Sequence, residues 1–260
     1  MIKLISLTSM QISFFRCLIA AIVFAVIFRK RVLNVNKLSI LNAFFYATVL
    51  TLFVIATKTT TAANAIFLQS TAPIYVLIFE PIIDKTRWER INIITVSVCF
   101  FAMLLFFIGE LSPGHLEGNI VALLAGVSFA AFFLGMRKNE TAYQQSAIFY
   151  GNIIVALICI PFILGIEAIA VSDLWMVSFL GVFQIAAAYA VFTYGIKRIL
   201  AVEASIISML EPVLSPLWVF LGYGEVPTKY AMIGGTIIIA AISARTLIMG
   251  AKAFRFQPDK

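Results

Sequence analysis

The sequence predicts an all-α fold, a polytopic bundle of about nine membrane-spanning helices. Of its 260 residues, 62% are hydrophobic and only 12% are charged, and the mean hydropathy is +1.05. A soluble domain is about 45–50% apolar and about 25% charged. No soluble core could cover so much apolar surface, so lipid must be the solvent for most of it.

The apolar residues fall into nine continuous runs, each close to the ~20 residues that cross a ~30 Å hydrocarbon layer as a helix. Because the runs do not alternate between apolar and polar residues, they indicate helices rather than strands of a barrel. The expected spans are Ile12–Phe28, Leu38–Thr57, Thr60–Ile83, Ile91–Gly109, Gly118–Met136, Gln144–Gly165, Val171–Ile196, Leu200–Gly224 and Thr228–Met249.

The positive charges predict the orientation of these spans. If nine helices alternate in direction, one side of the membrane receives 15 of the 19 Lys and Arg residues, and the other side receives Lys3, Arg16, Lys58 and Lys229. Basic loops stay on the cytoplasmic side. We therefore expect a multi-pass protein of the cell (plasma or inner) membrane with its C-terminus in the cytoplasm and this N-terminus outside. The net charge of +7 then reflects topology rather than binding to nucleic acid.

The two halves of the chain are related. An offset of 139 residues aligns the 34 positions from Leu41 to Ile74 with eight identities, including Lys58 with Lys197 and Pro73 with Pro212. The offset moves each span by five helices. Five is an odd number, so the two copies must point in opposite directions across the membrane, as in the inverted repeats of many secondary transporters.

This repeat predicts a division into residues 1–111, with four helices, and residues 112–260, with five. The span Gly118–Met136 has no counterpart in the first copy. The parent architecture should therefore have ten helices, and the first of them is missing here.

Three stretches resemble helices of the drug/metabolite transporter superfamily, of the ten-helix EamA-domain type. They are SFFRCLIA at Ser13–Ala20, Thr61–Ala65 followed by Pro73, and the series Ala204-Ser205, Glu211-Pro212 and Gly222–Glu225. The resemblance covers nearly the whole chain. It implies a secondary transporter that exports or exchanges a small metabolite or an amphiphilic compound by alternating access through a central cavity. It also implies that the helices matching residues 38–57, 60–83, 171–196 and 200–224 line that cavity.

The missing helix leaves two interpretations open. Either the coding sequence begins further upstream, or the chain is a truncated, transport-inactive member of the family with a structural role.

Glu211 is the most informative single residue. It lies near the middle of the span Leu200–Gly224, where a charged side chain costs ~2.5–3.5 kcal/mol on insertion scales. Such a carboxyl group faces a cavity, pairs with a cation or holds a proton. We therefore consider Glu211 a site of proton coupling or of substrate binding; the alternative is a protonated carboxyl group bonded to a neighbouring helix.

Pro73 and Pro212 occupy equivalent central positions in the two copies, and Pro216 follows Pro212 by one turn. Proline removes a helical hydrogen bond and bends the helix. Two equivalent kinks near the middle of the membrane suit an alternating-access cavity. The alternative is that they serve packing alone.

Other polar residues within the spans complete the expected site. The candidates for binding or coupling are Gln69, Ser70, Thr71, Gln184, Tyr46 and Tyr189. Hydrogen bonding between helices would explain any one of them. Arg16 is expected to anchor its helix at the outer surface, and Glu80 and Glu203 are expected to be solvated or paired near the cytoplasmic Lys85 and Lys197.

The sequence offers little for catalysis. The only histidine, His115, lies in a predicted loop, and no nucleophile–base pair or metal-ligand spacing is present. We therefore expect no catalytic residue, no metal and no cofactor, and a membrane-embedded enzyme is the weakest alternative. Without a nucleotide-binding loop to power a pump, the expected partners are a small-molecule substrate, membrane lipid and, through Glu211, protons.

Overall fold

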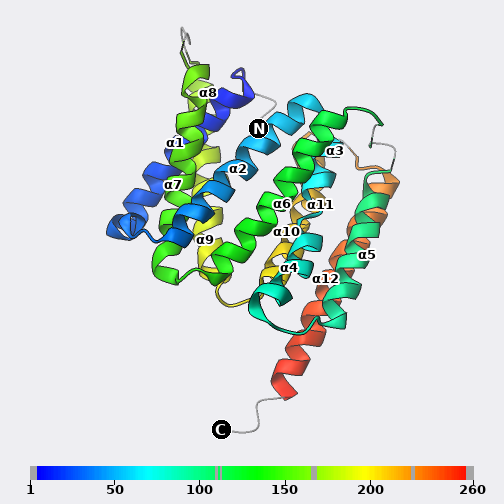
Figure 1. Ribbon diagram of the computed structural model, residues 1–260. Helices are drawn as coiled ribbons and strands as arrows, with labels where there is room; N and C mark the ends of the chain where they lie inside the picture. Colours follow the sequence, from blue (N-terminus) through cyan, green and yellow to red (C-terminus); the bar gives the residue numbers. More distant parts are fainter. Residues whose placement is uncertain (1–4, 109–110, 112, 165–168, 224–225, 256–260) are drawn as a thin grey trace. The chain divides into compact units, whose positions relative to one another are not determined.

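A computed structural model describes residues 5–108, 111, 113–164, 169–223 and 226–255 (Figure 1). These residues form helices joined by turns and short connections, without a strand among them. The predicted all-α, polytopic class is therefore confirmed. Within the described residues, seven helical stretches are long and apolar enough to cross a membrane. They are Ser9–Leu33, Lys37–Thr59, Ala62–Asp84, Leu116–Lys138, Thr141–Phe162, Val171–Gly195 and Lys229–Met249.

The two other predicted runs are helical as well. α5 (Arg90–Phe106) is apolar but only 17 residues long. The run from 200 to 224 forms α10 (Ala201–Ser208) and α11 (Leu210–Tyr223), which are separated by Met209. Each predicted run thus coincides with helical structure, and most ends differ by only a few residues. Gly224 and Glu225, which carry part of the family resemblance, lie outside the described residues.

Some of the seven stretches are single helices, namely α2 (Lys37–Thr59), α6 (Leu116–Lys138) and α12 (Lys229–Arg255). The others consist of several elements: α1 (Ser9–Phe28) with the 3₁₀ turn η2 (Arg29–Leu33), α3 (Ala62–Gln69) with α4 (Ala72–Asp84), α7 (Thr141–Cys159) with η3 (Ile160–Phe162), and α8 (Val171–Phe179) with η4 (Leu180–Ala187) and α9 (Ala188–Gly195). The segment η4 is a π-helix. It lies between α8 and α9, so this span changes its helical pitch in the middle.

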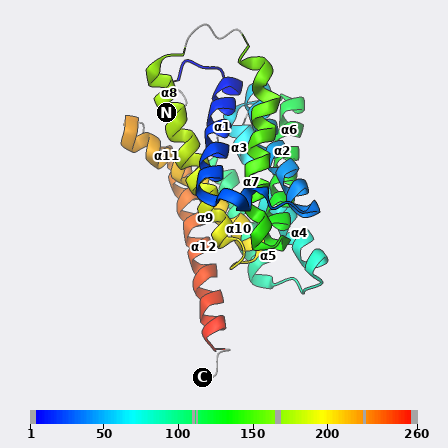
Figure 2. The same cartoon turned by 90° about the vertical axis from the view of Figure 1, so that its left-hand side faces the viewer.

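The chain divides into two compact units, and the first comprises residues 1–55 and 131–200. In this unit α1 packs against α7, α8 and η4 (Figure 2). The N-terminus of α1 is fixed by a capping box, in which Thr8 and Gln11 each accept a hydrogen bond from the other's backbone N–H. Cys17, Phe24 and Ile148 are fully buried and form part of the core of this unit.

The second unit comprises residues 56–130 and 201–260. Here α12 runs along α5, and α4 packs against α10 (Figure 1). The approach of α12 to α5 is close at Gly234, where an added Cβ atom would lie 2.6 Å from the carbonyl oxygen of Ala102. Small residues allow such backbone contact, which is the main way that helices associate in lipid.

Each compact unit combines segments from both halves of the sequence. The unit boundaries fall inside α2, after Ile55, and inside α6, after Ala130. Sequence repeats and compact units are therefore different divisions of this chain. The repeat boundary between residues 111 and 112 stays a prediction, and residue 112 is outside the described part of the structure.

Candidate functional site

The helices that carry Pro73 and Pro212 are both interrupted directly before the proline. α3 ends at Gln69, and α4 begins at Ala72 with Pro73 in its first turn. α10 ends at Ser208, and α11 begins at Leu210 with Pro212 in its first turn. Adding 139 to the ends of α3, Ala62 and Gln69, gives Ala201 and Ser208, which are the ends of α10.

The prolines therefore begin new helices. The sequence had led us to expect that they would bend continuous helices. N–H groups in a first helical turn have no acceptor within the helix, so a proline there loses no hydrogen bond. Pro216 differs, because it lies inside α11. There it removes a hydrogen bond to the preceding turn.

Three predicted site residues surround the first interruption. Gln69 is the last residue of α3, and Ser70 and Thr71 form the turn before α4. The Ser70 hydroxyl donates to the carbonyl of Ile66 (2.7 Å), and the Thr71 hydroxyl donates to that of Leu68 (2.6 Å). Both hydroxyls thus serve carbonyl groups at the interruption. Gln69 is half-buried, and its side-chain amide has polar groups that could contact a solute.

The helix α6 passes close to this turn. An added Cβ atom at Gly126 would lie 3.0 Å from the carbonyl oxygen of Leu68 and 3.1 Å from that of Gln69. Ala122 and Ala130, one turn away on either side, are almost fully buried. This stripe of small residues lets α6 lie directly against the interrupted backbone.

Glu211 lies in the first turn of α11, beside the second interruption, and its side chain is exposed. It is ten residues from the start of α10, or about 15 Å along a helix axis. The first turn of a helix carries a partial positive charge, which favours a carboxylate there. The sequence-predicted depth of Glu211 therefore coincides with a helix start.

Tyr46, Tyr189 and Gln184 belong to the first compact unit. The buried Tyr46 hydroxyl donates to Oδ1 of Asn152 at 3.4 Å, and its ring meets that of Tyr189 edge-to-face at 4.9 Å. Phe132 lies 5.5 Å from the Tyr46 ring and 5.6 Å from that of Phe192. We call Tyr46, Phe132, Tyr189 and Phe192 the aromatic cluster. It brings together two of the predicted residues.

Gln184 is exposed on the π-helix η4, and its Oε1 accepts a hydrogen bond from Nη1 of Arg16 at 3.5 Å. Sequence analysis treated Arg16 as an anchor at the end of its helix. In the structure α1 begins at Ser9, so Arg16 lies about 10 Å along the helix from that end. Its side chain contacts another helix, and Arg16 joins the candidate residues.

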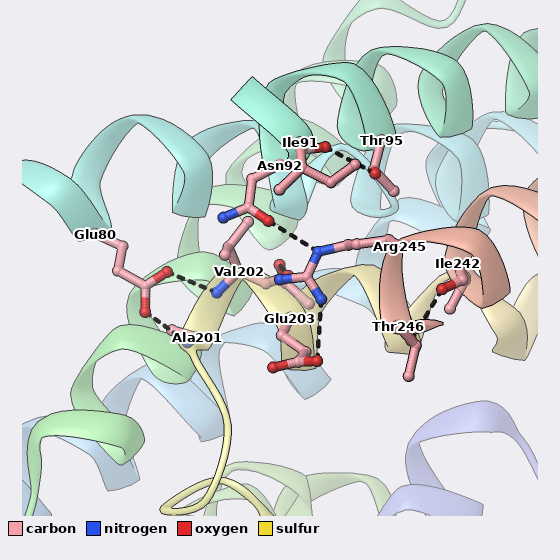
Figure 3. Close-up of polar contacts among 11 residues, drawn as sticks. Glu80, Ile91, Asn92, Thr95, Ala201, Val202, Glu203, Ile242, Arg245 and Thr246 are labelled. Carbon is pink, nitrogen blue, oxygen red and sulfur yellow. Dashed lines mark hydrogen bonds and ion pairs between the residues drawn. The ribbon is translucent and has the colours of Figure 1, made fainter. Parts of the chain in front are cut away.

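A buried ion pair occupies the second unit, and we call Arg245, Glu203 and Asn92 the arginine cluster (Figure 3). Arg245 on α12 is 2% exposed. Its Nη1 donates to Oε1 of Glu203 on α10 at 3.0 Å, and its Nε donates to Oδ1 of Asn92 on α5 at 2.8 Å. In the sequence Arg245 is one of the charges expected in the cytoplasm, and no nearby residue indicates that Glu203 and Asn92 are its partners.

Glu80 is also buried, whereas we expected it to be solvated or paired near Lys85. Its two carboxylate oxygens accept hydrogen bonds from the backbone N–H groups of Ala201 (2.6 Å) and Val202 (2.9 Å) (Figure 3). An acidic group at a helix N-terminus satisfies N–H groups that lack an internal acceptor. The residue before α10 is Leu200, which has no capping side chain. That missing cap is the signal that could have indicated an acidic partner from elsewhere.

Lys197, which follows α9, forms a hydrogen bond to the last turn of α6. Its Nζ donates to the backbone carbonyl of Arg137 at 3.0 Å, in the last turn of that helix. Burial lowers the pKa of Lys197, and the neighbouring Arg137 charge lowers it further. A cation at the last carbonyls of a helix stabilises the end of that helix.

Among the described residues, no group of three His, Cys, Asp or Glu side chains could hold a metal ion. The described polar groups instead gather at helix interruptions, at helix ends and between packed helices. Membrane-length helices define the class of polytopic membrane proteins. In this class, irregular backbone at membrane depth is buried in protein or lines a water-filled cavity.

Comparisons with known proteins give the same class. The EamA-like transporter family matches this chain in two segments, residues 1–108 and 116–245. The chain therefore belongs to the EamA-like transporter family. It is a multi-pass membrane transporter.

Two curated relatives are similar along most of the chain. An uncharacterized transporter of Archaeoglobus fulgidus is 24% identical over 192 residues, which cover 73% of this chain and 69% of the relative. The uncharacterized transporter YdfC of Bacillus subtilis is 26% identical over 255 residues, which cover 90% of this chain and 81% of the relative.

One crystal structure of a protein superposes on 94% of this chain and on 89% of its own, with a TM-score of 0.80. The two sequences are 15% identical, and at this identity the likeness shows a shared fold alone.

Proposed function

We propose that this transporter exports or exchanges a small metabolite or an amphiphilic compound by alternating access through a central cavity. In this proposal the chain consists of two inverted repeats, residues 1–111 and 112–260. The observation that carries it is the pair of interruptions before Pro73 and Pro212. The interrupted segments α3 and α10 have the same length and lie 139 residues apart.

Interrupted helices supply what a solute site in lipid needs. The last carbonyl groups of one half-helix and the first N–H groups of the next lack partners within the helix. They can bind a solute or an ion in the middle of the membrane, as in transporters with discontinuous helices. The amide of Gln69 lies at one such point.

The second part of the proposal concerns protons. Glu211 is the acidic residue in the first turn of α11. A carboxyl group in that place can hold a proton in one state of the cycle and release it in another, because its surroundings change with access to water. Exchange of a proton for the substrate would then drive transport without nucleotide.

The test is a pH-jump experiment on purified protein in proteoliposomes, with solid-supported membrane electrophysiology as the readout and a panel of small amphiphilic compounds as probes. We expect a transient current with at least one compound, and we expect it to depend on an imposed proton gradient. Glu211→Gln keeps the size of the side chain and removes its proton. The variant should lose the response to the gradient while substrate counterflow continues.

Glu117→Gln is the matched control, because Glu117 is also an exposed acid in the first turn of a helix, α6. It should behave as the unmodified protein does. A gradient response that survives in Glu211→Gln would contradict the coupling role. No current and no counterflow with any compound would favour the transport-inactive alternative.

A further inference from the structure

We infer that Arg16, together with Gln184, forms a binding site for a monovalent organic anion, namely a carboxylate carried on an aromatic or apolar body. The inference deepens the proposed function, on which it rests, by naming the charge class of the substrate. Its first support is the place of Arg16 within a membrane-length helix. An arginine there carries a cost of about 2.5–3.5 kcal/mol on insertion scales, so a compensating partner is expected.

Among the described residues, no Asp or Glu forms an ion pair with Arg16. Its hydrogen bond to the amide of Gln184 is long, at 3.5 Å, and its buried Nε has no hydrogen-bond partner among the described residues. By contrast, a nitrogen of Arg245 lies 3.0 Å from a carboxylate oxygen of Glu203, which makes an ion pair.

Arg16 and Arg245 therefore differ in the charge beside them. Arg245 is neutralised by the protein itself, through Glu203 at 3.0 Å. Arg16 has a guanidinium group with five donors. Its Nη1 donates to Gln184, and its buried Nε has no hydrogen-bond partner among the described residues. A planar guanidinium group binds a carboxylate through two parallel hydrogen bonds. A bound anion would supply both the missing charge and the missing acceptors.

The backbone is shaped to hold Gln184 opposite Arg16. Gly181 of the π-helix η4 lies against α1, where an added Cβ atom would be 2.9 Å from the carbonyl oxygen of Arg16 and 2.9 Å from Cβ of Ile19. Three residues later, Gln184 faces the guanidinium group. π-helical turns are rare and are frequently found at functional sites.

The aromatic cluster indicates the rest of the ligand. Tyr46 and Tyr189 belong to the same compact unit as Arg16, and the ring of Tyr46 contacts that of the half-buried Tyr189. Aromatic rings favour an apolar or aromatic body beside the anionic group. A single cation also argues for one negative charge, because a phosphate ester would call for a second Lys or Arg.

The test measures equilibrium binding to the purified chain in lipid nanodiscs by calorimetry, with three matched probes: phenylacetate, the neutral phenylacetamide and the dianion phenyl phosphate. We expect phenylacetate to bind at least tenfold more tightly than either of the others. Arg16→Gln should remove this preference. Arg16→Lys should keep part of it, because an ammonium group retains the charge but not the two-point geometry.

Arg198→Gln is the control, since Arg198 is an exposed cation of the same unit that lies over the ring of Tyr194. It should bind all three probes as the unmodified protein does. Arg16→Gln should also melt no lower than the unmodified protein, because it removes a cation that lacks a counter-charge. Such a result separates a binding role from a folding role.

Three outcomes would overturn the inference. The first is equal binding of phenylacetate and phenylacetamide, and the second is an anion preference that survives in Arg16→Gln. The third is a fall in the melting temperature of Arg16→Gln as large as that of Arg245→Met, which removes the arginine of the arginine cluster. Equilibrium binding needs no flux. An Arg16-dependent site without transport would therefore contradict the proposed function alone, and transport that is indifferent to Arg16 would contradict this inference alone.

Discussion

Arg245 joins three helices through one side chain. It lies on α12 and bonds to Glu203 on α10 and to Asn92 on α5 (Figure 3). Its exposed fraction is 2%, and that of the Glu203 side chain is 21%. Removing one partner from a buried ion pair leaves the other charge without compensation, which costs about 3–5 kcal/mol. Because Glu203 retains some contact with solvent, the loss should lie at or below the lower end of that range.

We therefore expect Arg245→Met to lower the free energy of unfolding and the melting temperature in detergent, followed by tryptophan fluorescence. Glu203→Gln should lower them as well, because it leaves the charge of Arg245, which is 2% exposed, without compensation. Arg198→Met is the matched control, and an exposed cation of this kind contributes about 1 kcal/mol or less. Equal melting of Arg245→Met and Arg198→Met would show that the arginine cluster does not hold the helices together.

The candidate residues near the helix interruptions differ in their hydrogen-bond partners. The hydroxyl groups of Ser70 and Thr71 donate to backbone carbonyl groups, so their observed contacts stabilise the turn between α3 and α4. In our proposal Gln69, Gln184 and Arg16 are the residues that contact a ligand. The hydrogen-bond partners given for the described residues thus distinguish Ser70 and Thr71, which satisfy the interrupted backbone, from these three candidates.

Among the packed elements, α5 and α12 depend on contact between their backbones. At Gly234 an added Cβ atom would lie 2.6 Å from the Ala102 carbonyl oxygen and 2.8 Å from the Phe106 nitrogen. Backbone atoms cannot turn away as a flexible side chain can. The two helices would have to separate, and overpacking of this kind costs about 1–3 kcal/mol.

Gly234→Ala should therefore melt at a lower temperature than the unmodified protein. Gly195→Ala provides the comparison, because no heavy atom lies within 4 Å of a Cβ atom added there. Alanine is also favoured over glycine in helices by about 1 kcal/mol, so this control should be neutral or stabilising. If both variants melt alike, the close approach of α12 to α5 is not tight in the folded protein.

For the molecule as a whole, the distribution of Lys and Arg predicts how the chain crosses the membrane. A C-terminal fluorescent-protein fusion should be fluorescent, and a C-terminal alkaline phosphatase fusion should be inactive, because the C-terminus is expected in the cytoplasm. A phosphatase inserted at Pro113, in a predicted outer loop, should be active. The reverse pattern at either position would contradict the predicted orientation.

The sequence alone determined the class of fold and the places of the helices. Burying an unbonded peptide group in lipid costs several kcal/mol, so each long apolar run has to be a helix, whatever its neighbours are. The same local reasoning marked the two regions around Pro73 and Pro212, because proline cannot donate a backbone hydrogen bond. These features depend on residues close together in the chain, and a single sequence displays them directly.

Only the tertiary structure decided which polar groups meet. Glu80 caps a helix that begins 121 residues later, and Arg245 bonds to Asn92 across 153 residues. Arg16 meets Gln184 across 168 residues, by way of a π-helix that no sequence pattern indicated. Such pairs depend on how helices pack, and in lipid the packing follows small residues and close backbone approach rather than apolar periodicity. A lone Arg or Glu in the sequence gives its cost of burial, and the fold determines what offsets that cost.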